Sequence, residues 1–251
     1  MKTFLAIVGG LCIAFAFGLL ILFAWLRWKI RRMAEKIGSS IEEAMEAAQK
    51  SSVPPFRIKL ASVAALEWQS PEEIEKRAAV LREAQFREAG TFIGEPANLR
   101  LAAFCHPEES AYAVIYEGPG GKTWMDLATY YEDGSSVTYT TVRDTLLDRP
   151  DNKLIRFFEG FGAEELLRTF LRERPRMPML PITPAEFAER FERAYAEGMD
   201  FRIAQGGPTE AEIRRIADRS ERECTPEIVG SIRSKWTEAI ERFRAGEVGG
   251  Q

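Results

Sequence analysis

The sequence predicts an α+β fold with a transmembrane helix at the N-terminus, then a mainly antiparallel sheet of about four to five strands packed with helices, and a helical C-terminal region. Three observations predict it. The chain opens on an uninterrupted apolar run, the hydrophobic period changes to two residues between Thr91 and Phe158, and helix-start signals recur after residue 163. We therefore expect four parts: an anchor with a basic collar (1–32), a juxtamembrane helix and Pro linker (33–55), an α+β domain (56–174) and a helical region (175–251).

The apolar run extends from Phe4 to Leu26 and contains no charged residue, Asn, Gln, Ser or Pro. As a helix rising 1.5 Å per residue it would reach about 34 Å, enough to cross a hydrocarbon core of about 30 Å. It is longer than the apolar core of a typical signal peptide, and no small-x-small cleavage site follows it. We therefore expect an uncleaved membrane anchor.

A collar of aromatic and basic residues follows the run, and both kinds of side chain favour the membrane interface. Only Lys2 and the terminal amine lie before the run. The positive-inside rule therefore predicts that the N-terminus lies outside and the C-terminal domain in the cytoplasm. The many Arg, Ala and Glu residues suggest a bacterial chain, so we expect a single-pass protein of the inner membrane. The residues expected at the interface are Trp25, Arg27, Trp28, Lys29, Arg31 and Arg32.

Between Met33 and Gln49 the apolar positions recur three and four residues apart, which indicates an amphipathic helix. We interpret it as a stalk on the surface of the domain or membrane. Homo-oligomerisation through this stalk or the anchor is the alternative, although the stripe covers only about two heptads. Ser51 to Pro55 form a linker, because proline stops a helix.

The composition is that of a globular domain, with 45% hydrophobic and 29% charged residues and a net charge of −4. A mildly acidic chain argues against a nucleic-acid partner, which needs a clustered basic surface. The three cysteines and the single histidine have no zinc-site or disulfide-framework spacing, and no glycine-rich nucleotide motif occurs. We therefore expect no metal and no cofactor.

The α+β part begins with a short strand-like alternation from Phe56 to Leu60. Ser70 and Pro71 then start a helix expected at 71–89, which Gly90 would end. Runs with a period of two residues predict strands at 99–105, 111–117, 123–132, 135–142 and 153–158.

Asp133-Gly134 predicts a hairpin with a two-residue type I′ turn. That turn would pair Glu132 with Ser135, and the alternation of side chains then places Trp124, Tyr130, Val137 and Tyr139 on one face. We expect this aromatic face to be partly covered by helices or by a partner. Its candidate binding residues are Trp124, Tyr130 and Tyr139.

The remaining chain predicts helices at 163–173 and from the capping signals at Thr183, Thr209 and Thr225 onward. Phe187, Phe191 and Tyr195 follow one another at steps of four residues. We interpret this aromatic stripe as core, rather than as the lining of a ligand site.

Two constellations are candidates for chemistry. Cys105 and His106 are adjacent, but neighbouring side chains on a strand point to opposite faces, so we interpret them as a buried cysteine followed by a turn histidine. Asp126 lies on the aromatic face, where a carboxyl could act as a general acid or base; the alternative is a solvated or Arg-paired edge residue. We assign no catalytic residue.

The stretch from Trp124 to Gly134, followed by Thr138 to Thr141, resembles a pattern in uncharacterised bacterial single-pass membrane-anchored proteins. The resemblance covers residues 70–160 and implies a membrane-tethered domain without implying an activity. We therefore expect a membrane-tethered cytoplasmic binding or scaffolding module, whose partners are the lipid bilayer and a protein at the cytoplasmic face. The alternative is a membrane-anchored, hydrolase-like enzyme that uses Asp126 or Cys105 with His106.

Overall fold

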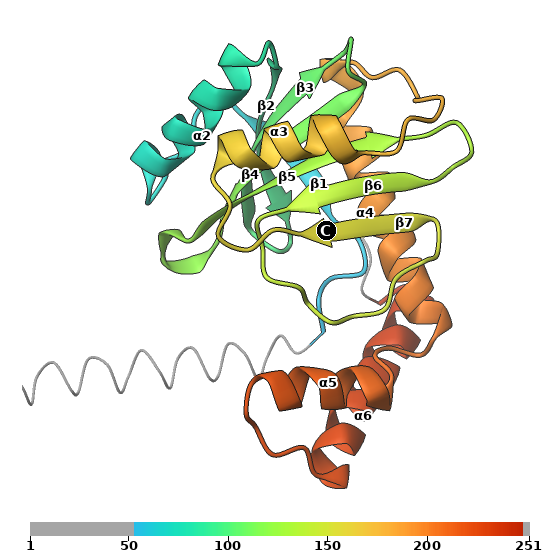
Figure 1. Cartoon of the computed structure of the whole chain (residues 1–251). Helices are drawn as coiled ribbons and strands as arrows, with labels where there is room; N and C mark the ends of the chain where they lie inside the picture. The colour runs from blue at the N-terminus through green and yellow to red at the C-terminus, as the bar shows by residue number, and fades with distance from the viewer. Residues whose placement is uncertain (1–52, 248–251) are drawn as a thin grey trace, which may run out of the picture. The chain divides into compact units, whose positions relative to one another are not determined.

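The computed structural model describes residues 53–247, so the predicted anchor, basic collar and stalk lie outside the described residues. The described part is a mixed α+β structure with a seven-stranded sheet and five α-helices, which confirms the predicted fold class at that level (Figure 1). Between residues 53 and 247, no helix has both the length and the apolar character that crossing a bilayer requires.

The strands follow one another across the sheet in chain order, and each pairs antiparallel with the next except β7, which runs parallel to β6. They are β1 (Lys59–Val63), β2 (Arg87–Glu95), β3 (Leu99–His106), β4 (Ala111–Glu117), β5 (Thr123–Tyr130), β6 (Ser136–Thr140) and β7 (Lys153–Phe157). The helices are α2 (Pro71–Glu83), α3 (Ala163–Glu173), α4 (Phe187–Ala204), α5 (Glu210–Arg219) and α6 (Pro226–Arg244).

The sheet has seven strands rather than the four to five predicted, and β2 is the one that no predicted strand matches, because its first residues lie within the predicted helix 71–89. Helix α2 ends at Glu83, six residues before the predicted end at residue 89. Gln85 adopts a φ of 65°, and the amide of Phe86 donates to the carbonyl of Leu81 at 2.9 Å, which closes the helix end without a glycine. Gly90 instead lies at a register shift within β2.

Helices cover both faces of the sheet. In Figure 1, α3 crosses the face toward the viewer and α4 runs behind the sheet. The core under α2 and α3 includes Leu81, Phe104, Met125, Leu127, Tyr139 and Phe170. The core under α4 includes Phe92, Leu101, Cys105, Tyr112, Tyr116 and Phe187. Because both faces are covered, β4 is buried at every position.

The hairpin between β5 and β6 has a three-residue loop, so the predicted two-residue turn is wrong. The amide of Tyr131 donates to the carbonyl of Ser135 at 2.9 Å, and the amide of Gly134 returns to the carbonyl of Tyr131 at 3.1 Å. Gly134 has a φ of 81°, as expected for the glycine that follows a type I turn in such a loop. The Asp133-Gly134 dipeptide is compatible with both this three-residue loop and the predicted two-residue turn.

This loop shifts the register of β6 by one residue, which moves its side chains to the other face. Tyr130 pairs with Ser136, and Leu127 pairs with Tyr139. Tyr139 therefore lies in the core under α2 and α3, whereas Tyr130 and Trp124 lie on the face under α4. The prediction that the three aromatic residues share a face is wrong for Tyr139.

The sheet curves around α4. Glu192 of α4 accepts a hydrogen bond from the amide of Leu60 in β1 at 2.8 Å, and the carbonyl of Ala194 accepts one from Lys153 in β7 at 3.2 Å. In a flat seven-stranded sheet these edge strands would lie about 29 Å apart. Glu192 and Ala194 differ by only about 3 Å along the helix, so the two edges must bend toward α4.

The residues just before β1 pack between α4 and α6. The Phe56 ring lies 5.9 Å from that of Trp236 and 5.1 Å from that of Phe243, and the Tyr195 hydroxyl donates to the carbonyl of Pro55 at 2.7 Å. The helices after residue 174 thus pack on the sheet and on the segment that precedes it. All described residues belong to one of the two units into which the chain divides, the one that begins at Val53.

A buried ion pair joins α4 to α5 and to the loop between β6 and β7. Glu212 of α5 lies 2.5 Å from the Arg202 guanidinium and accepts a hydrogen bond from the amide of Asp148 at 2.6 Å. The other Glu212 oxygen completes the capping box with Thr209, which confirms the predicted start of this helix.

Candidate functional site

A cavity of about 300 Å³ lies between α4 and the strands β4 to β7. Side chains that point from alternate strand positions toward α4 form one wall, and Ala128, Thr138 and Ala194 leave room because they are small. The sheet contributes Tyr112, Tyr116, Asp126, Ala128, Tyr130 and Thr138. The helix contributes Phe187, Arg190, Phe191, Ala194 and Tyr195.

Asp126 is the acidic residue of the cavity wall, and its position follows from the alternation along β5. Met125 and Leu127 point into the core under α2 and α3, so Asp126 points toward α4. Its Oδ1 atom is shielded from solvent and accepts no hydrogen bond from any described residue. A shielded acceptor without a donor costs about 1–3 kcal/mol.

Burial raises the pKa of the Asp126 carboxyl to about 6, although the Thr140 and Tyr116 hydroxyls oppose the shift by favouring the ionised form. The carboxyl is therefore mostly ionised at pH 7 and gains a proton within the physiological range. A titratable group in this state, inside a cavity, is typical of functional sites.

The tyrosines that line the cavity are neutral hydrogen-bond donors. Burial, together with the Asp126 carboxylate, holds the pKa of Tyr116 well above its ordinary value. Burial also raises the pKa of Tyr130 to about 12, assisted by Glu197 and opposed by Arg190. The cavity therefore presents one carboxylate among neutral aromatic side chains.

Arg190 brings a positive charge to the wall, but protein groups already occupy part of its guanidinium. Its Nη2 atom donates to the carbonyl of Pro181 at 3.0 Å and lies 3.5 Å from Oε1 of Glu186. Glu186 is one turn before Arg190, so the pair is local and offsets the charge of the arginine.

Comparisons of the chain with protein-family models, with curated proteins and with solved structures found no match. The functional assignment therefore depends on the geometry of the chain itself.

The structure distributes the three predicted binding residues differently. Tyr130 lines the cavity. Trp124 lies on the same face and stacks on Tyr116, with ring centroids 5.0 Å apart and an interplanar angle of 11°. Tyr139 is fully buried on the opposite face, where it stacks on Phe158. Since α4 covers the face of Trp124 and Tyr130, the space available there is the cavity rather than an open surface.

Phe187 of the aromatic stripe of α4 is core, as predicted: it is 2% exposed and belongs to the buried cluster on this face. Phe191 and Tyr195 are only partly buried, and all three side chains line the cavity, which is the alternative that the prediction set aside. Tyr112, Tyr116 and Arg190 are further cavity residues that the sequence did not single out. Their alternate spacing within a buried strand was the available signal for the two tyrosines.

Cys105 and His106 do not converge. Cys105 is fully buried on the face under α4, and burial raises the pKa of its thiol, which leaves little thiolate to act as a nucleophile. His106 faces the other side of the sheet, where its ring lies 5.2 Å from that of Phe86. This arrangement matches the interpretation of a buried cysteine and a turn histidine.

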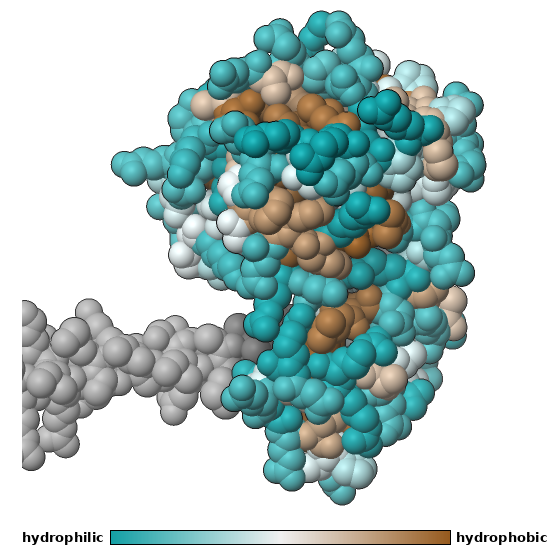
Figure 2. Space-filling model, in the orientation of Figure 1, coloured by the Kyte–Doolittle hydropathy of each residue, from teal (hydrophilic) through white to brown (hydrophobic). Residues whose placement is uncertain are grey.

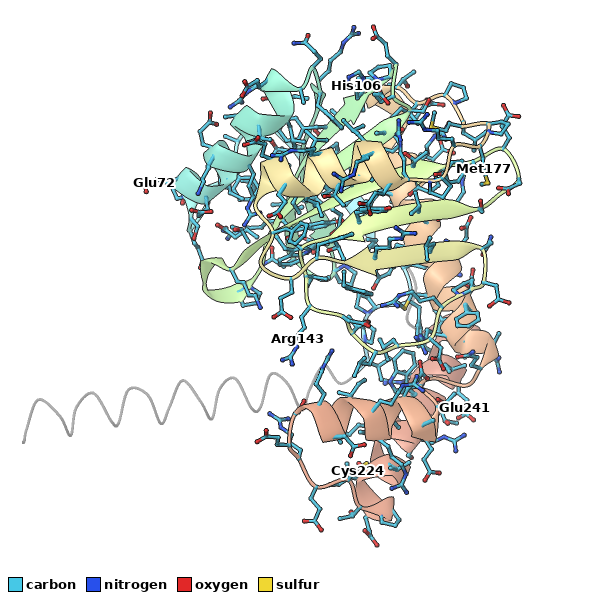
Figure 3. All side chains as sticks on the ribbon, in the orientation of Figure 1. Glu72, His106, Arg143, Met177, Cys224 and Glu241 are labelled. Carbon is cyan, nitrogen blue, oxygen red and sulfur yellow. The ribbon has the colours of Figure 1, made fainter. Side chains whose placement is uncertain are left out.

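Cys224 lies far from His106, near the opposite end of the described part of the chain (Figure 3). Within residues 53–247, no cluster of three or more His, Cys, Asp or Glu side chains is arranged to hold a metal ion.

Proposed function

We propose that this protein is a membrane-tethered binding module at the cytoplasmic face of a bacterial inner membrane, and that its binding site is the cavity under α4. The observation that carries the proposal is the Asp126 carboxylate, whose Oδ1 atom is shielded from solvent without a donor and which lines an otherwise mainly apolar and aromatic cavity. Small-molecule sites typically combine such walls with a few polar groups that orient the ligand.

The surface of the described part favours a small ligand over a scaffolding role. Its large exposed hydrophobic residues come from three separate elements: Leu154 from β7, Met177 from the connector between α3 and α4, and Ile228 from α6. Figure 2 shows a mostly hydrophilic face on which apolar side chains form separate patches. Protein-docking surfaces usually present a larger contiguous apolar patch.

The tether rests on the sequence alone, namely the apolar run from Phe4 to Leu26 and its basic collar. Its test is the full-length protein in a bacterial host, with either green fluorescent protein or alkaline phosphatase fused to the C-terminus. We expect the protein to stay in the membrane fraction after alkaline carbonate extraction. The fusion to green fluorescent protein should be fluorescent, and the fusion to alkaline phosphatase should be inactive. An active phosphatase fusion, or release by carbonate, would contradict the proposed tether and its orientation.

The cavity is tested with a neutral probe, para-fluorophenylethanol, by fluorine NMR of the full-length protein in a nonionic detergent. Empty micelles give the partitioning baseline. We expect saturable binding that Ala128→Leu and Ala194→Leu each abolish, because both substitutions fill the cavity from opposite walls. Ala204→Leu is the matched control, since Ala204 is exposed at the end of α4. Thermal unfolding of each variant verifies that it is folded.

One observation favours the hydrolase-like alternative, in which Asp126 acts as a general acid or base. Its carboxyl has a pKa of about 6 and lies beside the Tyr116 hydroxyl, a pairing suited to proton transfer. This alternative predicts hydrolysis of para-nitrophenyl acetate that Asp126→Asn abolishes. Equal hydrolysis by both proteins would remove the support for it.

A further inference from the structure

The two charged residues of the cavity wall differ in how far the protein satisfies them. Arg190 donates to the carbonyl of Pro181 and has Glu186 beside it. Asp126 has no ion-pair partner among the described residues. The Thr140 and Tyr116 hydroxyls favour its ionised form, but its Oδ1 atom receives no hydrogen bond. The cavity therefore lacks a positively charged hydrogen-bond donor for Asp126, whereas its own cation, Arg190, already has partners. The site is suited to a cation rather than to an anion.

The aromatic side chains of the cavity walls also favour a cation over an anion. Tyr116 and Phe191 lie 6.4 Å apart between ring centroids and come from opposite walls, and Tyr112 and Tyr130 form a second aromatic pair at 6.3 Å. The negative face of an aromatic ring attracts a cation, and this attraction strengthens where water is excluded. The same rings provide apolar contact area for the body of a ligand.

The carboxylate can reach such a ligand without backbone movement. Asp126 is only partly buried as a residue and lines the cavity, although Oδ1 itself is shielded. Rotation about the Cβ–Cγ bond is soft in aspartate, so a small turn of the carboxyl presents either oxygen to the cavity.

We propose that the cavity binds a small organic ammonium ion with an aromatic or apolar body, and that Asp126 is the counter-ion of its ammonium group. This inference rests on the proposed function, because it names the ligand class of the same site. A hydrogen bond to a charged group contributes more than a neutral one, and it forms here away from competing water.

The test compares three probes that share the fluorophenyl ring, are similar in size and differ in charge: para-fluorophenethylamine, para-fluorophenylethanol and para-fluorophenylacetate. Each is titrated by fluorine NMR against the full-length protein in nonionic detergent at pH 7.5, with empty micelles as baseline. We expect the amine to bind about tenfold more tightly than the alcohol, and the acetate to bind more weakly than both.

Asp126→Asn should remove the advantage of the amine, so that the variant binds the amine no more tightly than it binds the alcohol. Asp200→Asn is the matched control, because Asp200 is an exposed residue of α4 that pairs with Arg57 outside the cavity. The control variant should retain the full preference for the amine.

Three results would overturn the inference: equal affinity of the alcohol and the amine, tighter binding of the acetate than of the amine, or a preference for the amine that survives Asp126→Asn. In each of these cases a probe still occupies the cavity, so the proposed function stands. Failure of all the probes to bind would instead count against the proposed function itself.

Discussion

Replacing Asp126 with asparagine should stabilise the folded protein at pH 8. The carboxyl has a pKa of about 6 in the folded protein and 3.8 when unperturbed. That difference corresponds to about 3 kcal/mol of unfavourable free energy for keeping the carboxylate ionised in the folded state. Because the folded state binds this proton more tightly, its cost is present above pH 6 and disappears as the pH falls toward 4. Asparagine has nearly the same shape and carries no charge, so it avoids the cost at every pH.

The assay is denaturant unfolding of the full-length protein and of Asp126→Asn in nonionic detergent, followed by circular dichroism at several pH values between 4 and 8. We expect the variant to exceed the parent by up to about 3 kcal/mol at pH 8, and the difference to shrink to near zero at pH 4. Comparing the two proteins cancels the titration of the other carboxyls. A variant that is less stable at pH 8, or a difference that does not change with pH, would refute the reasoning.

Two further substitutions test how the C-terminal helices are held, and both are measured by the same unfolding assay. Glu212→Gln should destabilise the fold by about 3–5 kcal/mol because it leaves the buried Arg202 without its counter-charge, whereas Glu210→Gln, at an exposed pair with Arg214, should change it by at most about 0.5 kcal/mol. Desolvation alone would raise the pKa of Glu212, but hydrogen bonds from Thr209, Arg202 and Asp148 lower it. The stabilisation by Glu212 should therefore be lost as the pH falls through that lowered pKa. A Glu212→Gln variant as stable as the parent would contradict this account. Gly207→Ala should lower the free energy of unfolding by about 2–4 kcal/mol, because the new Cβ would lie 2.7 Å from the Cβ of Trp236. The control Gly206→Ala should lower it by only about 1 kcal/mol, since its Cβ meets nothing within 4 Å and only the positive φ is strained. Equal losses would show that backbone strain, and not the contact with Trp236, dominates.

Local signals predicted the elements whose causes are local. Helix α2 starts at Pro71 as predicted, although the Ser70 side chain makes no capping hydrogen bond, and α5 starts at the capping box of Thr209. The central strands follow from alternating apolar residues. Strand β2 was missed because the end of α2 depends on Gln85 adopting a left-handed conformation, which the residue type does not predict.

The register of β6 could not be read from Asp133-Gly134, because this dipeptide suits both a two-residue and a three-residue loop. The choice is made by packing: the longer loop places Val137 and Tyr139 in the core under α3, where Tyr139 contacts Phe170. Burial in the tertiary structure thus decides between two registers of β6 that differ by one residue and that the local sequence does not distinguish. This shift of one residue moves Tyr139 away from the predicted binding face.

The cavity was beyond sequence reasoning for a different reason. Asp126 was recognised as a residue of the right face, but its surroundings come from α4, which begins at Phe187 and reaches β5 only after the sheet has curved. No periodicity in the sequence encodes that curvature. The small residues Ala128 and Ala194, which create the space, are by themselves ordinary strand and helix residues.

Helix α4 connects the cavity to the part of the chain that follows the predicted anchor. Tyr195 lines the cavity, and its hydroxyl donates to the carbonyl of Pro55, while Asp200 of the same helix pairs with Arg57 at 2.6 Å. A ligand that fills the cavity therefore contacts the helix that holds residues 53–57.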